Sequence, residues 1–124
     1  MFNNGLLSAL PELLQGLIMF YFMCKVIDFA TGILKSRRFK KNWESQKMRD
    51  GLVRWFAELL GLAFVLGLDI LLGANTVLIV STLTLFIYRE AGSIKENLAE
   101  CGVFFSKDVE AAIEKLNKDN KGHE

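Results

Sequence analysis

Residues 53–72 read VRWFAELLGLAFVLGLDILL, an apolar stretch interrupted by Arg54, Glu58 and Asp69. Twelve of its twenty residues are Leu, Ile, Phe or Val, and about 20 helical residues suffice to cross a hydrocarbon layer of about 30 Å. Each apolar residue favours insertion by roughly 0.3 to 0.6 kcal/mol, whereas a charge at the centre of a span costs about 3 kcal/mol. The stretch therefore predicts a membrane span whose charged side chains face other helices or water rather than lipid.

Two further apolar stretches flank this one, at residues 13–34 and 76–91. The first carries Lys25 and Asp28 within it, and the sixteen residues of the second reach only about 24 Å as a helix. A hydrophobic content of 52% in 124 residues exceeds what a soluble core of that size would hold. We predict an all-α membrane protein with three transmembrane helices, a basic linker and a short C-terminal amphipathic helix.

A competing layout takes the nineteen uncharged residues 70–88 as the span and lays residues 51–68 on the membrane surface. The hairpin of two spans is favoured because Gly73 and Asn75 are turn residues. It is also favoured because Glu58 and Asp69 lie eleven positions apart. This spacing equals three helical turns, so both side chains lie on one face.

Positive charge is concentrated between the first two spans, where residues 35–49 contain seven basic side chains and one acidic side chain, Glu44. The positive-inside rule makes this linker cytoplasmic, so the N-terminus and the Gly73–Asn75 turn lie outside and the chain after Glu90 lies inside. Because apolar segments flank the linker, we expect it to contact anionic lipid headgroups rather than nucleic acid. The linker residues are Lys35, Arg37, Arg38, Lys40, Lys41, Lys47 and Arg49.

The ionisable residues of the three stretches are expected to form a polar seam between helices or to line a pore between subunits. The rise of a helix places Asp28 about 10 Å and Glu58 about 8 Å from the cytoplasmic ends of their spans, so Asp28 is expected to pair with Arg54 or Lys25. Two roles for these residues are compatible with the sequence: an ion-pair network that holds the helices together, or a surface that becomes hydrated when subunits assemble. The seam residues are Lys25, Asp28, Arg54, Glu58, Asp69 and Glu90.

The third helix is expected to continue to Glu100 and to end at Gly102 in a left-handed cap. Ser106 can then cap an amphipathic helix, whose apolar face would need its own bundle, another subunit or the headgroup layer as a partner. The sequence predicts a transmembrane domain over residues 1–104, and a cytoplasmic helix followed by a disordered tail from Asn117 within residues 105–124. The apolar face comprises Val109, Ala112, Ile113 and Leu116.

Enzymatic chemistry is not expected. Cys24 and Cys101 have neither a disulfide framework nor metal-ligand spacing around them, and the single histidine, His123, lies in the polar C-terminal run. The sequence shows no pairing of a nucleophile with a base and no Gly-rich phosphate loop, so no cofactor is expected.

Three motifs in a fixed order carry a resemblance to a known family over about residues 20–116. They are DFATG at residues 28–32, the basic linker leading into Gly51, and YREAGSIKEN at residues 88–97. In order and spacing they resemble the phage-lysis and toxin-secretion holin family. The matching positions are Asp28, Thr31, Gly32, Gly51, Tyr88, Glu90, Ser93, Ile94, Asn97 and Gly102.

The resemblance implies a protein that accumulates in the bacterial plasma membrane and then oligomerises with itself into lesions. Such lesions release an endolysin or a toxin, which is a functional partner without stable contact. Two departures are visible: Val103 stands where family members often have proline, and the next methionine is Met19, inside the first span, which argues against a second start. Alternative functions are an antiholin, a small channel or transporter subunit, or a membrane anchor acting through residues 107–117.

Cysteine labelling in intact cells tests the predicted orientation. In a background lacking the two native cysteines, an impermeant reagent applied from outside should mark positions near Asn3 and Asn75 but not Ser45 or Asn120, because the basic linker stays inside. Labelling of Ser45 from outside would overturn the orientation.

Overall fold

Four helices make up the described part of the chain. The computed structural model describes residues 12–38 and 45–121, which contain no strand. The helices are α2 (Glu12–Arg38), α3 (Ser45–Leu72), α4 (Val77–Glu100) and α5 (Lys107–Lys121). The first three are long and apolar enough to cross a membrane. The predicted fold class, an all-α membrane protein with three spans and a short fourth helix, is confirmed.

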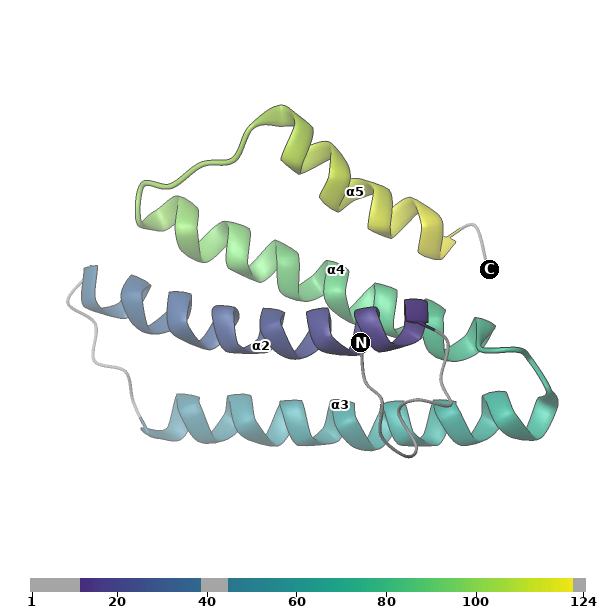
Figure 1. The fold of residues 1–124 in the computed structure, drawn as a ribbon. Helices are drawn as coiled ribbons and strands as arrows, with labels where there is room; N and C mark the ends of the chain where they lie inside the picture. Colours follow the sequence, from purple (N-terminus) through teal and green to yellow (C-terminus); the bar gives the residue numbers. More distant parts are fainter. Residues whose placement is uncertain (1–11, 39–44, 122–124) are drawn as a thin grey trace.

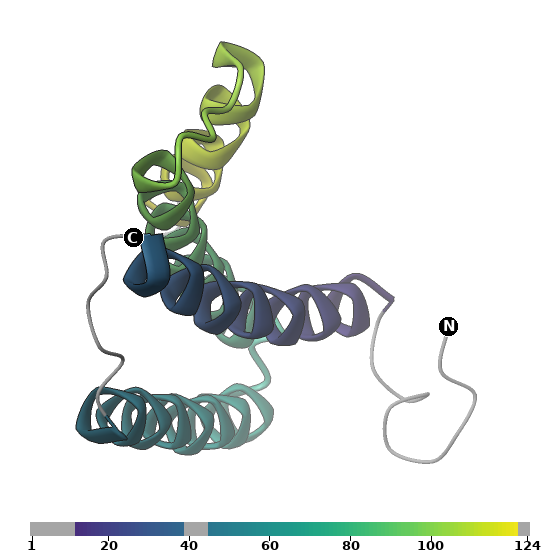
Figure 2. The ribbon, with the colours of Figure 1, turned by 90° about the vertical axis from the view of Figure 1, so that its left-hand side faces the viewer.

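Helix α4 packs against each of the other three helices. Figure 1 shows α2 and α4 running side by side in the same direction, with α3 running the opposite way and α5 on the outer side of α4. Figure 2, turned by 90° from Figure 1, shows α3 set apart from α2. The main helix pair is therefore α2 with α4, and α3 joins it mainly through α4.

The apolar core lies between α2 and α4. Its residues recur at intervals of three, four or seven, the spacing that keeps side chains on one face of a helix. α3 contributes only partly buried residues to this core, and its outer side chains Phe56, Leu60 and Phe64 are each about 60% exposed or more. In a bilayer that outer face meets lipid. The buried apolar core residues are Leu14, Tyr21, Cys24, Ile79, Leu83 and Ile87.

Helices α2 and α3 continue well beyond their apolar stretches. α2 ends at Arg38 and α3 begins at Ser45, so most of the residues expected in a linker are helical. Lys and Arg are good helix formers, and backbone hydrogen bonding continues where the chain leaves the hydrocarbon layer. Lys35, Arg37 and Arg38 belong to α2, and Lys47 and Arg49 to α3, whereas Lys40 and Lys41 lie outside the described residues.

Trp55 of α3 is half-buried and packs against α2. Its ring centroid lies 5.9 Å from that of Phe22 and 6.1 Å from that of Phe29, both on α2. Its indole Nε1 is buried and has no hydrogen-bond partner within the described part of the chain. Trp55 is therefore the main aromatic contact of α3 with α2.

The chain reverses direction between α3 and α4 in a turn that uses left-handed backbone conformations. Gly73, Asn75 and Thr76 have φ angles of 62°, 56° and 70°. Glycine adopts such angles freely and asparagine does so more readily than most residues, but a β-branched threonine is an outlier there. This turn excludes the competing layout with a single helix over residues 70–88.

The side chain of Asp69 holds the turn in place. Its carboxylate oxygens accept hydrogen bonds from the backbone N–H groups of Thr76 at 2.8 Å and Ile79 at 3.0 Å. These are donors that the first turn of a helix leaves unsatisfied, and a carboxylate is favoured at that end by the helix dipole. Asp69, although it belongs to α3, therefore caps α4 and offsets the strain at Thr76.

The end of α4 follows the sequence prediction closely. Gly102, with φ 87°, donates its backbone N–H to Ala99 O at 3.0 Å, and Val103 donates to Leu98 O at 2.8 Å. This pair of bonds is the Schellman arrangement that ends a helix at glycine. The predicted end at Glu100 and the left-handed cap are both confirmed.

The C-terminal helix folds back onto α4. Ser106 Oγ accepts the backbone N–H of Val109 at 3.3 Å, as expected for a capping residue. Leu116 packs against the bundle core, so its own bundle is the partner of that part of the apolar face. α5 continues through Asn117 to Lys121, so the expected disordered tail does not begin at Asn117. Lysine is a good helix former, so the polar composition of this run does not by itself end the helix.

The cap at Asp69 can be tested by replacing its carboxylate. We expect Asp69→Ala to lower the free energy of unfolding by about 2 kcal/mol, because two backbone N–H groups lose their acceptor. Asp69→Asn should have an intermediate effect, because its amide retains one acceptor oxygen. Thermal unfolding in detergent measures both, with Asp50→Ala at an exposed position of α3 as the control. If Asp69→Ala unfolds at the same temperature as Asp50→Ala, the cap does not stabilise the hairpin.

Candidate functional site

One lysine joins all three membrane-spanning helices. Lys25 Nζ on α2 lies 2.9 Å from Glu58 Oε2 on α3 and 2.7 Å from Glu90 Oε1 on α4. The side chains of Lys25, Glu58 and Glu90 are only 6%, 19% and 10% exposed. We call these three residues the charged triad. An ion pair this well buried holds its helices firmly in register, because separating its members leaves charges unpaired.

The charged triad lies near the middle of the bundle. Lys25, Glu58 and Glu90 are each the fourteenth residue of their helices, which contain 27, 28 and 24 residues. The sequence placed Glu58 nearer to the cytoplasmic end of its span. Glu58 is central in α3 because α3 begins in the basic segment, several residues before its apolar stretch. Within the candidate span Arg49–Leu72 it is still nearer to the basic end, as the sequence predicted.

Tyr21 completes the coordination of Glu58. Its hydroxyl donates to Glu58 Oε1 at 2.8 Å, and Lys25 Nζ lies 5.8 Å from the centroid of its ring. Both oxygens of Glu58 are therefore bound from α2. Sequence reasoning missed Tyr21, although its position one turn before Lys25 placed it on the same face of the helix.

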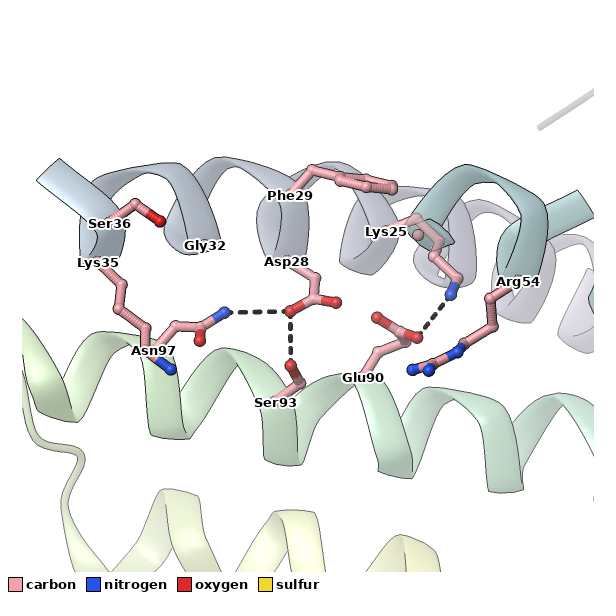
Figure 3. A pocket seen from close by; sticks show the side chains of 11 residues that line it. Lys25, Asp28, Phe29, Gly32, Lys35, Ser36, Arg54, Glu90, Ser93 and Asn97 are labelled. Carbon is pink, nitrogen blue, oxygen red and sulfur yellow. Dashed lines mark hydrogen bonds and ion pairs between the residues drawn. The ribbon is translucent and has the colours of Figure 1, made fainter. Parts of the chain in front are cut away.

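Asp28 makes a separate set of contacts one turn further along α2. Its Oδ1 accepts hydrogen bonds from Ser93 Oγ at 2.7 Å and Asn97 Nδ2 at 3.2 Å (Figure 3). Asn97 Nδ2 also donates to Thr31 Oγ1 at 3.1 Å. Three neutral side chains, Thr31 of α2 and Ser93 and Asn97 of α4, thus form a hydrogen-bonding group beside the carboxylate of Asp28.

The predicted pairing of Asp28 with Arg54 or Lys25 is wrong. Within the described part of the chain Asp28 has no ion pair, because α4 presents neutral donors at its level and two glutamates bind Lys25. Arg54 is exposed on α3 and points toward the space beside Glu90 (Figure 3). Of the six predicted seam residues, three form the triad, Asp28 and Arg54 lie beside it, and Asp69 caps α4 instead.

A polar cavity of about 330 Å³ lies between α2, α3 and α4. Its walls carry both signs of charge, with Lys25, Lys35 and Arg54 against Asp28 and Glu90. The described residues contain no group of three or more His, Cys, Asp or Glu side chains suited to a metal ion. Six of the ten family-like positions line this cavity: Asp28, Gly32, Gly51, Glu90, Ser93 and Asn97.

The other four family-like positions have structural contacts nearby. Thr31 bonds to Asn97, Ile94 packs against the core, Tyr88 donates to Glu114 at 3.2 Å, and Gly102 ends α4. Gly51 gives α2 and α3 room to approach, because a Cβ there would lie 3.2 Å from Phe29 Cε1. The resemblance thus concentrates on the polar cavity and on the packing that shapes it.

The sequence profile of the bacteriophage holin family matches residues 5–118. The chain belongs to this family. A "Probable holin" of Bacillus phage phi105 is 30% identical over 95 residues, which cover 77% of this chain and 70% of that protein. The "Uncharacterized protein YqxH" of Bacillus subtilis (strain 168) is 29% identical over 96 residues, which cover 77% of this chain and 68% of that protein. No solved structure matches the chain significantly.

Family membership confirms the resemblance found in the sequence and supports a phage holin role for this chain. Together with the three apolar helices, it describes a multi-pass membrane protein. It also points to a function that is not enzymatic. The polar cavity and the charged triad are therefore features of a holin subunit.

The triad can be tested by removing its lysine. We expect Lys25→Met to destabilise the holin by roughly 3–5 kcal/mol, because Glu58 and Glu90 would remain buried without a counter-charge. The triple variant Lys25→Met, Glu58→Gln and Glu90→Gln should recover most of this loss, since it removes all three charges together. Membrane-inserted protein and thermal unfolding in detergent measure both effects.

The matched control is Lys35→Met. Lys35 forms an ion pair of 2.8 Å with Glu100, but their side chains are 35% and 45% exposed. Exposed pairs contribute about 0–1 kcal/mol, so this variant should behave nearly as the parent does. Equal losses from Lys25→Met and Lys35→Met would contradict a stabilising role for the triad.

Proposed function

We propose that this holin accumulates in the bacterial plasma membrane as separate subunits and then assembles into a lesion. The lesion would let an endolysin or a toxin pass to the far side of the membrane. The observation that carries this proposal is the charged triad at the middle of three spanning helices. Ionisable groups at that depth are costly in lipid and are retained chiefly where they have a function.

The weak attachment of α3 makes such a change of partners physically reasonable. Only 6% of the most apolar part of α3 is buried within the bundle, against 22% for the corresponding parts of α2 and α4. Glu58 is nevertheless bound by two side chains of α2. If α3 moves away, Glu58, Lys25 and Glu90 need new partners, and water shared between many subunits would supply them. Assembly would then depend on subunit density in the membrane.

The distribution of charge supports an orientation with the N-terminus outside and the C-terminus in the cytoplasm. In Figure 1 the end of α2, the start of α3 and the end of α4 all lie at one end of the bundle. That end carries Lys35, Arg37, Arg38, Lys47 and Arg49, and such basic residues fit anionic headgroups on the cytoplasmic side.

The membrane potential would influence the timing of assembly if triad charges move between the two states. One elementary charge moved across the whole membrane is worth about 2.3 kcal/mol per 100 mV. A charge that moves only part of the way contributes a corresponding fraction of that energy to the balance between the two states. Loss of the potential would therefore be able to trigger opening.

Inducible expression with a potential-sensitive dye tests the proposal. Cells making the parent protein should lose their potential abruptly after a delay. Glu58→Gln should insert normally, because its amide can still bond to Tyr21 and Lys25, but should shift the onset at least twofold. The shift is expected because the energy of exposing a neutral amide differs from that of a carboxylate.

Glu96→Gln, at an exposed position of α4, serves as the control and should keep the parental onset. Normal membrane yield without any loss of potential in cells making the parent protein would refute lesion formation and favour an antiholin or an anchor. A parental onset for Glu58→Gln would show that the triad does not control assembly.

A further inference from the structure

The second carboxylate oxygen of Glu90 has no hydrogen-bond donor among the described residues, and the carboxylate of Asp28 interacts with Glu90. Glu90 is only 8% exposed, and its Oε1 is bound to Lys25 Nζ. Its Oε2 is buried without a hydrogen bond, although Glu90 lines the polar cavity. Buried charged oxygens in folded proteins are almost always bonded, to protein, water or an ion. Glu90 Oε2 therefore indicates a hydrogen-bond donor or cation held in the cavity.

The cavity reaches the middle of the bundle from one end only. It runs from Lys25 and Glu90 to Lys35 and Ser36 near the end of α2, about 16 Å along the helix at 1.5 Å per residue. At a volume of about 330 Å³ it has room for roughly ten waters at about 30 Å³ each.

The opposite half of the interface is apolar. Leu14, Ile79 and Leu83 are at most 4% exposed there, and the groove that they border has no polar lining. Water entering the polar cavity would therefore stop at the charged triad.

The lining carries three basic and two acidic side chains, but two of the basic ones are already paired with acidic residues. Lys25 is already bound by two glutamates, and Lys35 is paired with Glu100. Counting these partners, four acidic side chains stand against three basic ones, a net charge of minus one. The acidic side chains are Asp28, Glu58, Glu90 and Glu100, and the basic ones are Lys25, Lys35 and Arg54.

The chemistry of the walls favours a small monovalent cation with N–H donors. Lys25 Nζ lies 2.7 Å from Glu90 Oε1, so a divalent ion at this carboxylate would meet a strong repulsion. Asp28, Ser93 and Asn97 line the same cavity, and their side-chain oxygens are acceptors that suit an ammonium group. A quaternary ammonium has no N–H to donate and would leave Glu90 Oε2 unpaired.

We propose that each holin subunit contains a water-filled crevice, open at the membrane face where α2 ends, that binds small ammonium-type cations at Glu90. The proposal rests on the membrane placement given under Proposed function but not on assembly into a lesion. The crevice gives the triad a hydrated path to one side of the membrane while the subunit is still closed. Subunits that later separate their helices would already carry water at the middle of the bilayer.

Charged thiol reagents can probe the crevice in sealed vesicles. The test protein carries Ser93→Cys in a background of Cys24→Ala and Cys101→Ser. The vesicles expose the membrane face where α2 ends, as established by labelling at Ser45, and retain a trapped dye to show that they are intact. Free cysteine, trapped inside the vesicles, consumes any reagent that crosses the bilayer. The two reagents are 2-aminoethyl methanethiosulfonate and 2-sulfonatoethyl methanethiosulfonate.

We expect the ammonium reagent to modify Ser93→Cys at least tenfold faster than the sulfonate reagent, after correction for their rates with a free thiol. Ser81→Cys is the matched control, because Ser81 lies on the same helix, twelve residues away and outside the cavity, and bonds to its own helix. This control should not react from that face.

Adding Glu90→Gln should reduce the ratio of the ammonium rate to the sulfonate rate to less than twofold. Adding Glu100→Gln, at the exposed end of α4, should leave at least half of the original ratio. If Glu90→Gln does not accumulate, Asp28→Asn gives the same test with a second carboxylate of the crevice. No modification of Ser93→Cys from that face, or equal rates for the two reagents, would overturn the proposal. Because the vesicles stay sealed, these outcomes are independent of whether the protein forms a lesion.

Discussion

The ammonium group of Lys25, bound by Glu58 and Glu90, is the interaction on which the rest of this bundle depends. Apolar side chains alone give little drive for helix association inside a bilayer, because lipid chains are equally apolar. A buried lysine with two acidic partners on different helices fixes both the register and the choice of neighbours. It also makes the bundle sensitive to any change that offers those charges a more polar environment.

The interface between α2 and α4 changes character halfway along its length. One face of α2 passes from Leu14 and Tyr21 to Lys25, Asp28 and Thr31, all at helical spacing. The facing side of α4 shows the same change, from apolar side chains to Glu90, Ser93 and Asn97. The family-like motifs lie in the polar half, which explains why the resemblance was detectable from so few residues. The apolar half carries only packing, which many side chains satisfy equally well.

Much of the fold was predictable from the sequence, because hydrophobic length and turn chemistry are local properties. The three spans, the reversal at Gly73 and the glycine end of α4 all follow from short stretches of chain. Partner choice among the charged residues was not predictable. Asp69 looked like part of the same acidic face as Glu58 but caps α4, and helix periodicity alone cannot distinguish a capping carboxylate from a paired one. The extension of α2 and α3 into the basic sequence was not predictable either, because charge marks the end of an apolar stretch but not the end of a helix.

The position of Trp55 gives this holin an internal optical reporter. Its indole ring lies between the rings of Phe22 and Phe29, on the contact that joins α3 to α2. The chain has two tryptophans, so replacing Trp43 by phenylalanine leaves a single fluorophore on that contact. Indole emission shifts to longer wavelength when the ring moves from apolar to hydrated surroundings. The separation of α3 from its neighbours is therefore open to spectroscopy in real time, without any added label.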